Sequence, residues 1–493
     1  MPKRAATFEL TLPPRDPGTP ATLWLSSSLR TEILEGRLRP GSRLPATRDL
    51  ARQYGLSRGT IVSAFEQLKA EGYVDGSVGS GTYVNETLPD ELLQVSHDGL
   101  GGASQRNTGP RRRLSQYARH ARLYPPFPAR AARAFRFGQP ALDLFPTTLW
   151  AQLGSRRHRS ATSGMLLGCD AMGYRPLREA VAGYLTTSRG VRCAPEQIAI
   201  VSGVQEALDL ATRVLIDRGD RVALEDPGYM GAALAFEAAG AKVISVGIDD
   251  EGMLVPSARM RDIRLAYVTP GHQFPLGVSM SLPRRLALLE WARKSDALIF
   301  EDDYDSEYRY SGRPLSSLQG LDRHGVVLFA GSFSKVMFPS LRLGYLVIPA
   351  DLVDYFEAVK SLGTRHAPLL NQAILCDFIN DGHFGRHVRR MREVYADRLS
   401  SLVDSSKEYL AGMVEISAVD AGLQSVGWLG DGINANTVQK HAAERGVEAW
   451  PLSRYSRTLR IREGLQLGFG AVDAREIRRG ARELAVVLER LSK

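Results

Sequence analysis

The sequence predicts an α/β protein with a mostly parallel central sheet, preceded by a small helical module and a linker. Three textures support this: a dense helical pattern over residues 21–84, a loop-like stretch over residues 85–135, and short apolar runs alternating with helical patterns beyond. Such alternation favours a parallel sheet with helices on both faces. The apolar runs typical of buried strands are residues 198–201, 221–224, 243–246, 265–268, 298–300, 326–329 and 345–348, and the helical patterns between them include residues 205–216 and 282–294.

The composition is that of a globular protein. The 493 residues are 44% hydrophobic and 24% charged, which excludes a globally disordered chain. The three cysteines, Cys169, Cys193 and Cys376, are too few and too scattered for a disulfide framework or a zinc cluster, so we expect no metal site. No run reaches the ~18 uninterrupted apolar residues of a membrane helix. We therefore expect a cytoplasmic protein that binds no membrane.

Positive charge gathers in the linker. The chain carries 63 Lys and Arg against 54 Asp and Glu, and residues 89–136 hold nine basic and three acidic side chains. A flexible arm near a polyanion has this character, and so does an ordinary solvated linker. We divide the chain into a first domain over residues 1–88, a basic linker over residues 89–134 and a large domain over residues 135–493.

The first domain contains a helix-turn-helix pattern. A short helix over residues 48–54 ends at Gly55, and a second helix begins at residue 58 with Ser57 well placed as its N-cap. In helix-turn-helix proteins the first turn of the second helix reaches base edges in the major groove. Arg58 is of the type that pairs with guanine, and Thr60 of the type that touches a thymine methyl. An ordinary helical hairpin is the alternative interpretation.

Longer motifs decide between these two interpretations. The stretches over residues 44–51, 57–61, 68–73 and 79–84 together resemble the GntR family of winged helix-turn-helix regulators, over nearly all of residues 21–84. The resemblance implies double-stranded DNA as a partner. By that resemblance the DNA contacts are Arg48, Ser57, Arg58, Thr60, Gly79 and Gly81.

The large domain carries a lysine motif suited to an aldehyde cofactor with a phosphate. Lys335 follows Ser332 and Ser334 at the end of an apolar run, and Arg342 lies seven residues further on. The lysine is suited to form a Schiff base, while hydroxyls and a guanidinium are suited to bind a phosphate dianion.

Three further motifs at strand ends fit the same cofactor. Asp302 is suited to keep a pyridine nitrogen protonated, and Tyr304 lies near enough in sequence to bind the ring's phenolic oxygen. Tyr229 is suited to stack on the ring. Residues 201–207 join a strand to a helix, whose first N–H groups can hold phosphate. Taken singly, each motif could equally be surface charge or a solvated loop without a function in binding.

In this order on an alternating α/β chain, these motifs resemble fold-type I aminotransferases, and residues 173–180 and 269–275 add to the match. The whole chain resembles the MocR/GabR family of transcriptional regulators, which implies pyridoxal 5'-phosphate as cofactor and a homodimer. By that resemblance Lys335 carries the internal aldimine, Asp302 meets the pyridine nitrogen, Tyr304 meets the phenolic oxygen and Tyr229 stacks on the ring. The residues implied to hold the phosphate are Gly203, Val204, Gln205, Ser332, Ser334 and Arg342.

Four positions depart from a working aminotransferase. Gln466 falls where such enzymes place an arginine for the substrate carboxylate, and residues 274–277 replace the Asn-Pro-Thr-Gly motif. Gly168 aligns with the tyrosine that a partner subunit often supplies, and residues 230–233 lack an arginine after the stacking tyrosine. Arg460 and Arg462 are candidate substitutes for the missing arginine.

These features favour a transcriptional regulator that senses an amine, an amino acid or the cofactor itself. An active aminotransferase with a DNA-binding head is the main alternative, and we expect negligible transamination because the bidentate arginine is missing. A third hypothesis is a plain repressor whose large domain only dimerises.

Overall fold

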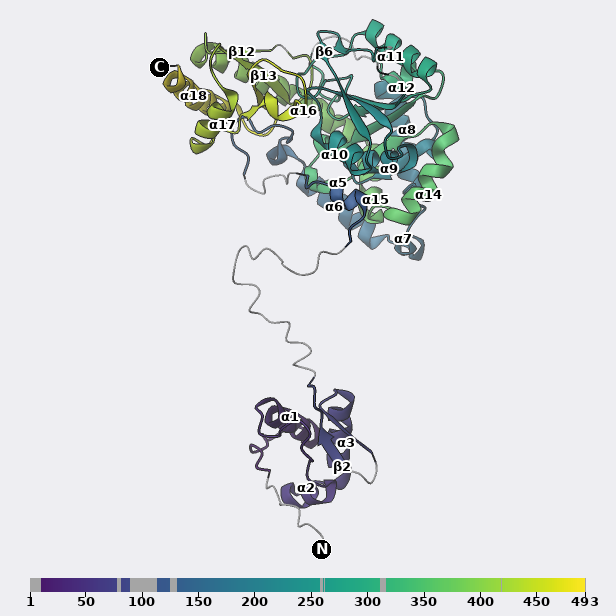
Figure 1. Ribbon diagram of the computed structural model, residues 1–493, viewed down its shortest axis with the longest axis vertical. Helices are drawn as coiled ribbons and strands as arrows, with labels where there is room; N and C mark the ends of the chain where they lie inside the picture. Colours follow the sequence, from purple (N-terminus) through teal and green to yellow (C-terminus); the bar gives the residue numbers. More distant parts are fainter. Residues whose placement is uncertain are drawn as a thin grey trace. The chain divides into compact units, whose positions relative to one another are not determined.

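The computed structural model describes residues 10–77, 81–88, 113–124, 131–257, 260, 262–310, 316–417 and 419–492. The chain divides into two compact units, Met1–Arg112 and Arg113–Lys493 (Figure 1). The domain boundaries expected at residues 88 and 135 stay predictions. Among the described residues, no helix combines the length and the apolar character that crossing a membrane requires.

The described residues of the first unit form three helices followed by a β-hairpin. Strand β1 pairs antiparallel with β2, as expected for the wing, and Gly55 in the left-handed conformation ends α2 at the predicted place. The elements are α1 Ala21–Leu34, α2 Thr47–Tyr54, α3 Arg58–Ala70, β1 Val74–Ser77 and β2 Gly81–Val84.

A core of its own holds the first unit together. Leu25, Leu29 and Ile33 repeat at helical spacing on α1 and are buried. They belong to the same cluster as Ile61 and Leu68 of α3. Burial of these faces orients α3 with its first turn exposed.

The second unit is built on a seven-stranded sheet in which all seven predicted runs are strands. The strand order is β3-β11-β10-β9-β8-β4-β5, and the pairings are parallel except for those of β11 with its two neighbours. This confirms the mostly parallel sheet. The strands are β3 Ile198–Val201, β4 Arg221–Glu225, β5 Lys242–Val246, β8 Ile263–Val268, β9 Leu298–Asp303, β10 Val327–Ser332 and β11 Gly344–Val347.

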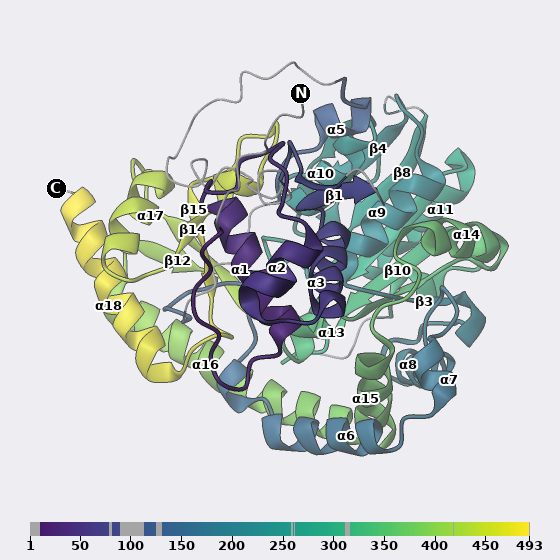
Figure 2. The same cartoon turned by 90° about the horizontal axis from the view of Figure 1, so that it is seen from below.

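Both faces of this sheet are covered because successive side chains point to opposite faces. Val222 and Leu224 of β4 join one buried cluster, while Ala223 between them joins another. The first cluster includes residues of α9 and α10, and the second includes residues of α11. Helices α6 and α15 pack side by side (Figure 2). The helices are α5 Gln116–His120, α6 Thr147–Arg159, α7 Ser163–Leu167, α8 Arg175–Arg189, α9 Val204–Leu215, α10 Met230–Ala238, α11 Leu282–Ser295, α12 Leu318–Leu321, α13 Phe333–Val336, α14 Val353–Gly363, α15 Leu369–Asn380 and α16 His383–Tyr409, with short 3-10 turns η2 Leu142–Leu144, η3 Pro195–Gln197, η4 Pro339–Leu341 and η5 Ala350–Leu352 and the small hairpin β6 Ile248–Asp249 and β7 Gly252–Met253.

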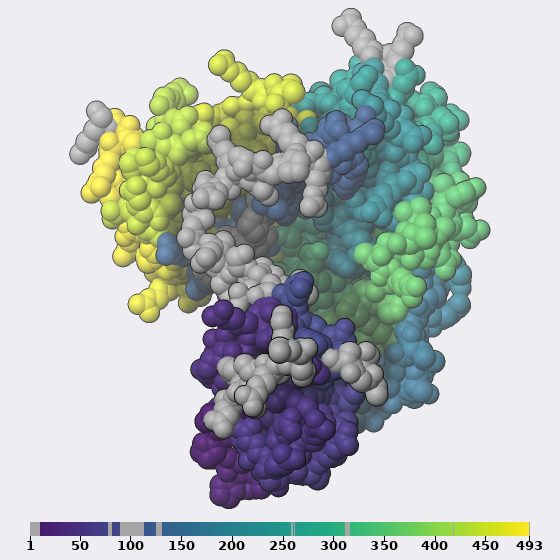
Figure 3. Space-filling model, turned by 60° about the horizontal axis from the view of Figure 1, so that its bottom comes forward, coloured from purple at the N-terminus to yellow at the C-terminus, as the bar shows by residue number. Residues whose placement is uncertain are grey.

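A second, antiparallel sheet follows α16 and was not predicted. We call residues 142–410 the sheet lobe and residues 414–491 the C-terminal lobe; α16 of the sheet lobe packs against α18 of the C-terminal lobe, which lies along the left of this unit in Figure 3 (yellow). The order of the second sheet is β12-β13-β15-β14. Its elements are β12 Val414–Ile416, β13 Gln424–Leu429, α17 Ala435–Glu444, β14 Trp450–Pro451, η6 Leu452–Tyr455, β15 Gly464–Gly468 and α18 Ala474–Leu491.

Candidate functional site

A cavity of about 440 Å³, which we call the central cavity, lies in the second unit. Strands β3, β4, β8, β9 and β10 run in the same direction, so their carboxyl ends meet at one edge of the sheet, where ligands bind in open α/β sheets. The C-terminal lobe contributes Gln424, Glu448, Trp450, Arg454 and Tyr455 to the lining. All ten residues predicted to hold the cofactor line this cavity: Gly203, Val204, Gln205, Tyr229, Asp302, Tyr304, Ser332, Ser334, Lys335 and Arg342.

Lys335 lies in the single turn α13, which begins where β10 ends. Its Nζ donates a hydrogen bond of 2.7 Å to the Gly138 carbonyl, in the segment that precedes the sheet lobe. Desolvation by burial lowers the pKa of Lys335 below its usual range. The cavity therefore favours the neutral amine, which is the nucleophilic form.

Asp302 near the end of β9 has one oxygen occupied and one available. Tyr267 of β8 donates from its hydroxyl to Asp302 Oδ2 at 2.6 Å, whereas the buried Oδ1 has no hydrogen-bond partner in the described part of the chain. Burial raises the pKa of Asp302 to about 7. Tyr267 was missed by the sequence analysis because an isolated tyrosine in an apolar strand carries no pattern.

One corner of the cavity has the donors that a phosphate requires. Gly203 precedes α9 with φ 121°, a conformation that favours glycine, and the first N–H groups of α9 have no partner within the helix. Ser334 Oγ is buried without a partner among the described residues. A Cβ placed on Gly203 would lie 3.9 Å from an Arg342 terminal nitrogen, so the guanidinium belongs to the same corner.

Two tyrosines border the cavity. The Tyr229 hydroxyl donates to Gln205 Oε1 at 3.2 Å and lies 3.2 Å from the hydroxyl of Tyr124. The Tyr304 hydroxyl lies 3.0 Å from Nδ1 of His272. Tyr124 belongs to the stretch that the sequence analysis assigned to the linker, and its composition gave no sign that it reaches a site.

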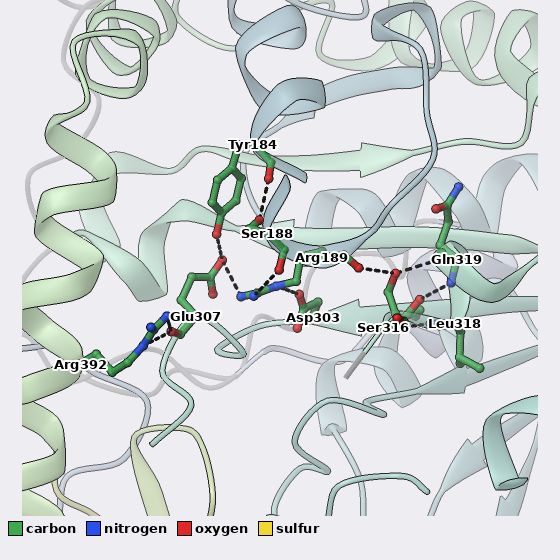
Figure 4. Close-up of polar contacts among 12 residues, drawn as sticks. Tyr184, Ser188, Arg189, Asp303, Glu307, Ser316, Leu318, Gln319 and Arg392 are labelled. Atoms are coloured by element: carbon green, nitrogen blue, oxygen red, sulfur yellow. Dashed lines mark hydrogen bonds and ion pairs between the residues drawn. The ribbon is translucent and has the colours of Figure 1, made fainter. Parts of the chain in front are cut away.

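The acidic run on β9 is divided between the two faces of the sheet. Asp302 faces the central cavity, whereas Asp303 accepts from Arg189 Nε at 2.9 Å on the opposite face (Figure 4). Glu307 receives the Tyr184 hydroxyl at 2.8 Å and lies 3.4 Å from Arg189. These residues border a different cavity of about 450 Å³. The Asp303 carboxylate therefore has a structural partner and is not available to the central cavity.

In the first unit the predicted DNA contacts that the structure describes lie at the starts of α2 and α3 and on strand β2 of the hairpin. The Ser57 side chain accepts from the Thr60 N–H at 3.1 Å, which confirms its place as N-cap. Arg48 and Arg58 are exposed. Gly81 has φ 99°, and the guanidinium of Arg43 occupies the space beside it, a residue that the sequence analysis did not single out. Gly79 lies outside the described residues.

Comparison with known proteins now decides the family. The family "Aminotransferase class I and II" matches residues 137–426, and "Bacterial regulatory proteins, gntR family" matches residues 25–84. The probable rhizopine catabolism regulatory protein MocR of Rhizobium meliloti is 38% identical over 95% of this chain and 94% of its own length. The chain belongs to the MocR-type GntR transcriptional regulators.

Other similarities agree with a MocR-type regulator. The pyridoxine biosynthesis transcriptional regulator PdxR of Corynebacterium glutamicum is 31% identical over 96% of this chain and 97% of its own length. The α-aminoadipate aminotransferase LysN of Thermus thermophilus, solved with N-(5'-phosphopyridoxyl)-L-leucine, is 30% identical with a TM-score of 0.66 over 73% of this chain and 92% of its own. The predicted regulator with an aminotransferase-like unit is therefore confirmed.

At the position where the sequence predicts loss of a substrate-binding arginine, this MocR-type chain has Gln466, whose buried Nε2 has no hydrogen-bond partner among the described residues. Gln466 of β15 is fully buried, and its Oε1 accepts from the Tyr455 hydroxyl at 2.6 Å. Arg462 is exposed and pairs with Glu415 at 3.1 Å. Neither Arg460 nor Arg462 is among the cavity-lining residues, so the structure does not bring these two candidate substitutes to the site.

At the other positions where this MocR-type chain departs from aminotransferases, neighbouring side chains occupy the space. Phe274 packs edge-on against Tyr229 and against Tyr455, with ring centroids 6.0 and 5.0 Å apart. A Cβ on Gly168 would lie 2.7 Å from His366 Nε2, and a Cβ on Gly231 would overlap the side chains of neighbouring residues. Larger side chains at these two glycines therefore require the surroundings to shift.

Proposed function

We propose that this regulator holds pyridoxal 5'-phosphate in the central cavity, covalently through Lys335, and that its signal is an amine, an amino acid or the cofactor itself. The observation that carries the proposal is a set of buried polar atoms in the cavity lining that have no partner among the described residues: Asp302 Oδ1, Ser334 Oγ and Gln424 Nε2. Buried polar atoms in folded proteins almost always have a partner, so an absent one marks a place for a ligand.

The residues present fit this cofactor. Asp302 Oδ1 is an acceptor for a pyridinium N–H, and the raised pKa of this carboxyl falls again once a cation lies beside it. Ser332, Ser334, Arg342 and the first N–H groups of α9 supply donors to the phosphate. When bound, the cofactor supplies an aldehyde and an electron-withdrawing ring.

The side chains around the ring then have separate tasks. Burial lowers the pKa of Lys335, which favours the neutral amine, the form that bonds an aldehyde carbon. Tyr229 and Tyr304 both line the cavity, and the proposal assigns Tyr229 to cover one ring face and Tyr304 to bind the phenolic oxygen. The Tyr304 hydroxyl keeps His272 as a hydrogen-bonding neighbour, which fixes its direction.

The absorption spectrum of the purified protein tests this proposal. Wild-type protein loaded with pyridoxal 5'-phosphate is expected to show a visible band that borohydride removes, leaving the cofactor on the peptide that contains Lys335. Lys335→Ala is expected to lose the band completely. Lys407→Ala, an exposed lysine of α16, serves as the matched control and should keep it. A band that survives in Lys335→Ala contradicts the assignment.

The first unit binds double-stranded DNA through the winged helix-turn-helix, and we propose specific contacts. They are the predicted residues Arg48, Ser57, Arg58, Thr60, Gly79 and Gly81, and we add Arg43, whose guanidinium lies beside Gly81, as a proposed phosphate contact. What supports them is the exposure of Arg48 and Arg58 at the first turns of α2 and α3.

We propose that the second unit also forms a homodimer. Leu166 and Leu167 of α7 are 81% and 90% exposed, beside the position Gly168 where a partner subunit's tyrosine is usual in the fold. Adjacent apolar side chains that a monomer leaves in water favour a protein interface. Sedimentation at micromolar concentration is expected to give a dimer, and Leu166→Asp with Leu167→Asp a weaker one. A wild-type monomer contradicts this part of the proposal.

Transamination is the second candidate function, because the fold and the cavity are those of aminotransferases. The buried Gln466 opposes it, since a ligand finds no bidentate arginine at that position. We therefore propose that the cavity binds an amine without sustained turnover.

A further inference from the structure

Two arginines line the central cavity without an ion-pair partner among the described residues. Arg342 precedes β11 in the sheet lobe, and Arg454 lies in η6 of the C-terminal lobe. The other arginine of the lining, Arg136, already binds Glu448 with nitrogen–oxygen distances of 2.6 and 2.9 Å. The cavity thus presents two available guanidinium groups, one on each lobe.

These two groups face different parts of the cavity lining. Arg342 lies beside Gly203 in the corner with Ser334, where the proposed phosphate binds. Arg454 is instead held over the indole ring of Trp450, with its guanidinium carbon 4.2 Å from the ring centroid. Such stacking fixes the direction of a guanidinium and leaves its N–H groups open to an anion.

We propose that Arg454 binds the carboxylate of the ligand, so that the ligands of this cavity are amines that also carry a carboxylate. The inference rests on the proposed function and adds the ligand's chemical class. It rests on a contrast: Gln466 is not among the cavity-lining residues and its amide oxygen accepts from the Tyr455 hydroxyl, whereas Arg454, the residue directly before Tyr455, lines the cavity. On this proposal, the cation that binds the ligand carboxylate lies in the turn η6 rather than on strand β15.

The acidic groups of the cavity leave Arg454 free for this role. The described lining residues that carry a carboxylate are Asp302 and Glu448. Asp302 lies on β9 in the sheet lobe with Tyr267, and Glu448 is bound by Arg136. A ligand carboxylate can therefore pair with Arg454, which has no carboxylate partner among the described residues, whereas Arg136 is already paired. A charge-assisted bidentate pair is among the stronger polar contacts.

A pair of stable cofactor adducts tests this without knowledge of the natural ligand. N-(5'-phosphopyridoxyl)-L-leucine and N-(5'-phosphopyridoxyl)-isoamylamine differ only in the carboxylate. Calorimetric titration of cofactor-free, full-length protein should give a dissociation constant at least about tenfold lower for the leucine adduct. In Arg454→Ala that ratio is expected to fall to about one, with Arg454→Lys in between.

Three controls make the outcome specific. Arg342→Ala is expected to weaken both adducts equally, which preserves the ratio, because it acts on the phosphate. Arg460→Ala, an exposed residue outside the cavity lining, should change neither value. A wild-type ratio near one, or a ratio unchanged in Arg454→Ala, overturns the inference while leaving the proposed cofactor in place. Failure of both adducts to bind wild-type protein instead overturns the proposed function.

Discussion

The two lobes around the central cavity follow the aminotransferase pattern to different degrees. The sheet lobe brings all ten predicted cofactor residues to one edge, with Asp302, Ser334 and Lys335 placed by the ends of β9 and β10. In the C-terminal lobe the Tyr455 hydroxyl instead occupies the amide oxygen of Gln466, and the exposed Arg454 lines the cavity. In this chain the lobe that would hold the cofactor has the residues expected of an aminotransferase, while the lobe that would hold a substrate carboxylate does not.

This difference separates binding a ligand from turning it over. Turnover requires the reacting bond to be aligned with Lys335, and such positioning supplies several kcal/mol of the barrier in enzymes. A cation in the turn η6 holds a carboxylate at another place than an arginine on β15 does. A sensor loses nothing by this, because an equilibrium response needs only different affinities in its two states.

The largest expected effect is therefore the near absence of transamination. Loaded with cofactor and given a panel of amino acids with 2-oxoglutarate, the protein should release fewer than about one glutamate per cofactor per minute, against the ~1–10³ per second typical of enzymes. Glutamate is measured with an aminotransferase of the same fold as positive control and Lys335→Ala as blank. Many turnovers per minute with any amino acid would break the distinction between the two lobes.

The sheet lobe was largely predictable because its signals are local. Each strand is a short apolar run, and most of the predicted cofactor residues lie at or just after the carboxyl end of one, so the parallel topology gathers them at one edge. The C-terminal sheet gave no comparable signal. Its strand β14 is only the pair Trp450–Pro451, and β13 and β15 contain the buried polar residues Gln424 and Gln466.

The residues that sequence reasoning missed are those whose role depends on long-range contact. Tyr267 is one apolar-strand residue among many until β8 pairs beside β9 and its hydroxyl meets Asp302. Arg454 belongs to no motif. Its role is inferred from its stacking on Trp450 and from the hydrogen bond between Tyr455 and Gln466. Arg460 and Arg462 were the nearer choices in sequence, and spacing alone cannot show that they lie outside the cavity lining.

The second prediction sharpens the comparison through the charge of Asp302. Burial raises its folded pKa to about 7, above the ~4 of an unfolded chain, so the cofactor-free protein loses stability as pH rises through that interval. Asp302→Asn removes this cost and keeps an acceptor for Tyr267. It is expected to increase the free energy of unfolding at pH 8 by roughly 2–4 kcal/mol, with the gain vanishing towards pH 4.

Two contrasts check that prediction by denaturant unfolding. With pyridoxal 5'-phosphate bound the sign should reverse, because Asp302→Asn removes the counter-charge of the pyridinium. Asp303→Asn, the neighbour on the opposite face, should destabilise the protein, since it leaves the buried Arg189 with one partner fewer. A cofactor-free Asp302→Asn protein that is less stable than wild type at pH 8 would show that this carboxylate has a partner already.

The smallest effect concerns the hydrogen bond between Tyr455 and Gln466 in the C-terminal lobe. Tyr455→Phe keeps the ring that packs against Phe274 but removes the hydroxyl that Gln466 Oε1 accepts, so a buried acceptor is left without its donor. The free energy of unfolding should fall by about 1–2 kcal/mol, while the cofactor band and the affinity ratio of the two adducts stay unchanged. Replacing both partners, as Tyr455→Phe with Gln466→Leu, should recover most of the loss because neither polar atom remains unpaired. If Tyr455→Phe instead left stability intact and lowered only the affinity for the carboxylate-bearing adduct, Gln466 would be the residue that reads the ligand, and the C-terminal lobe would resemble an aminotransferase more than this hydrogen bond indicates.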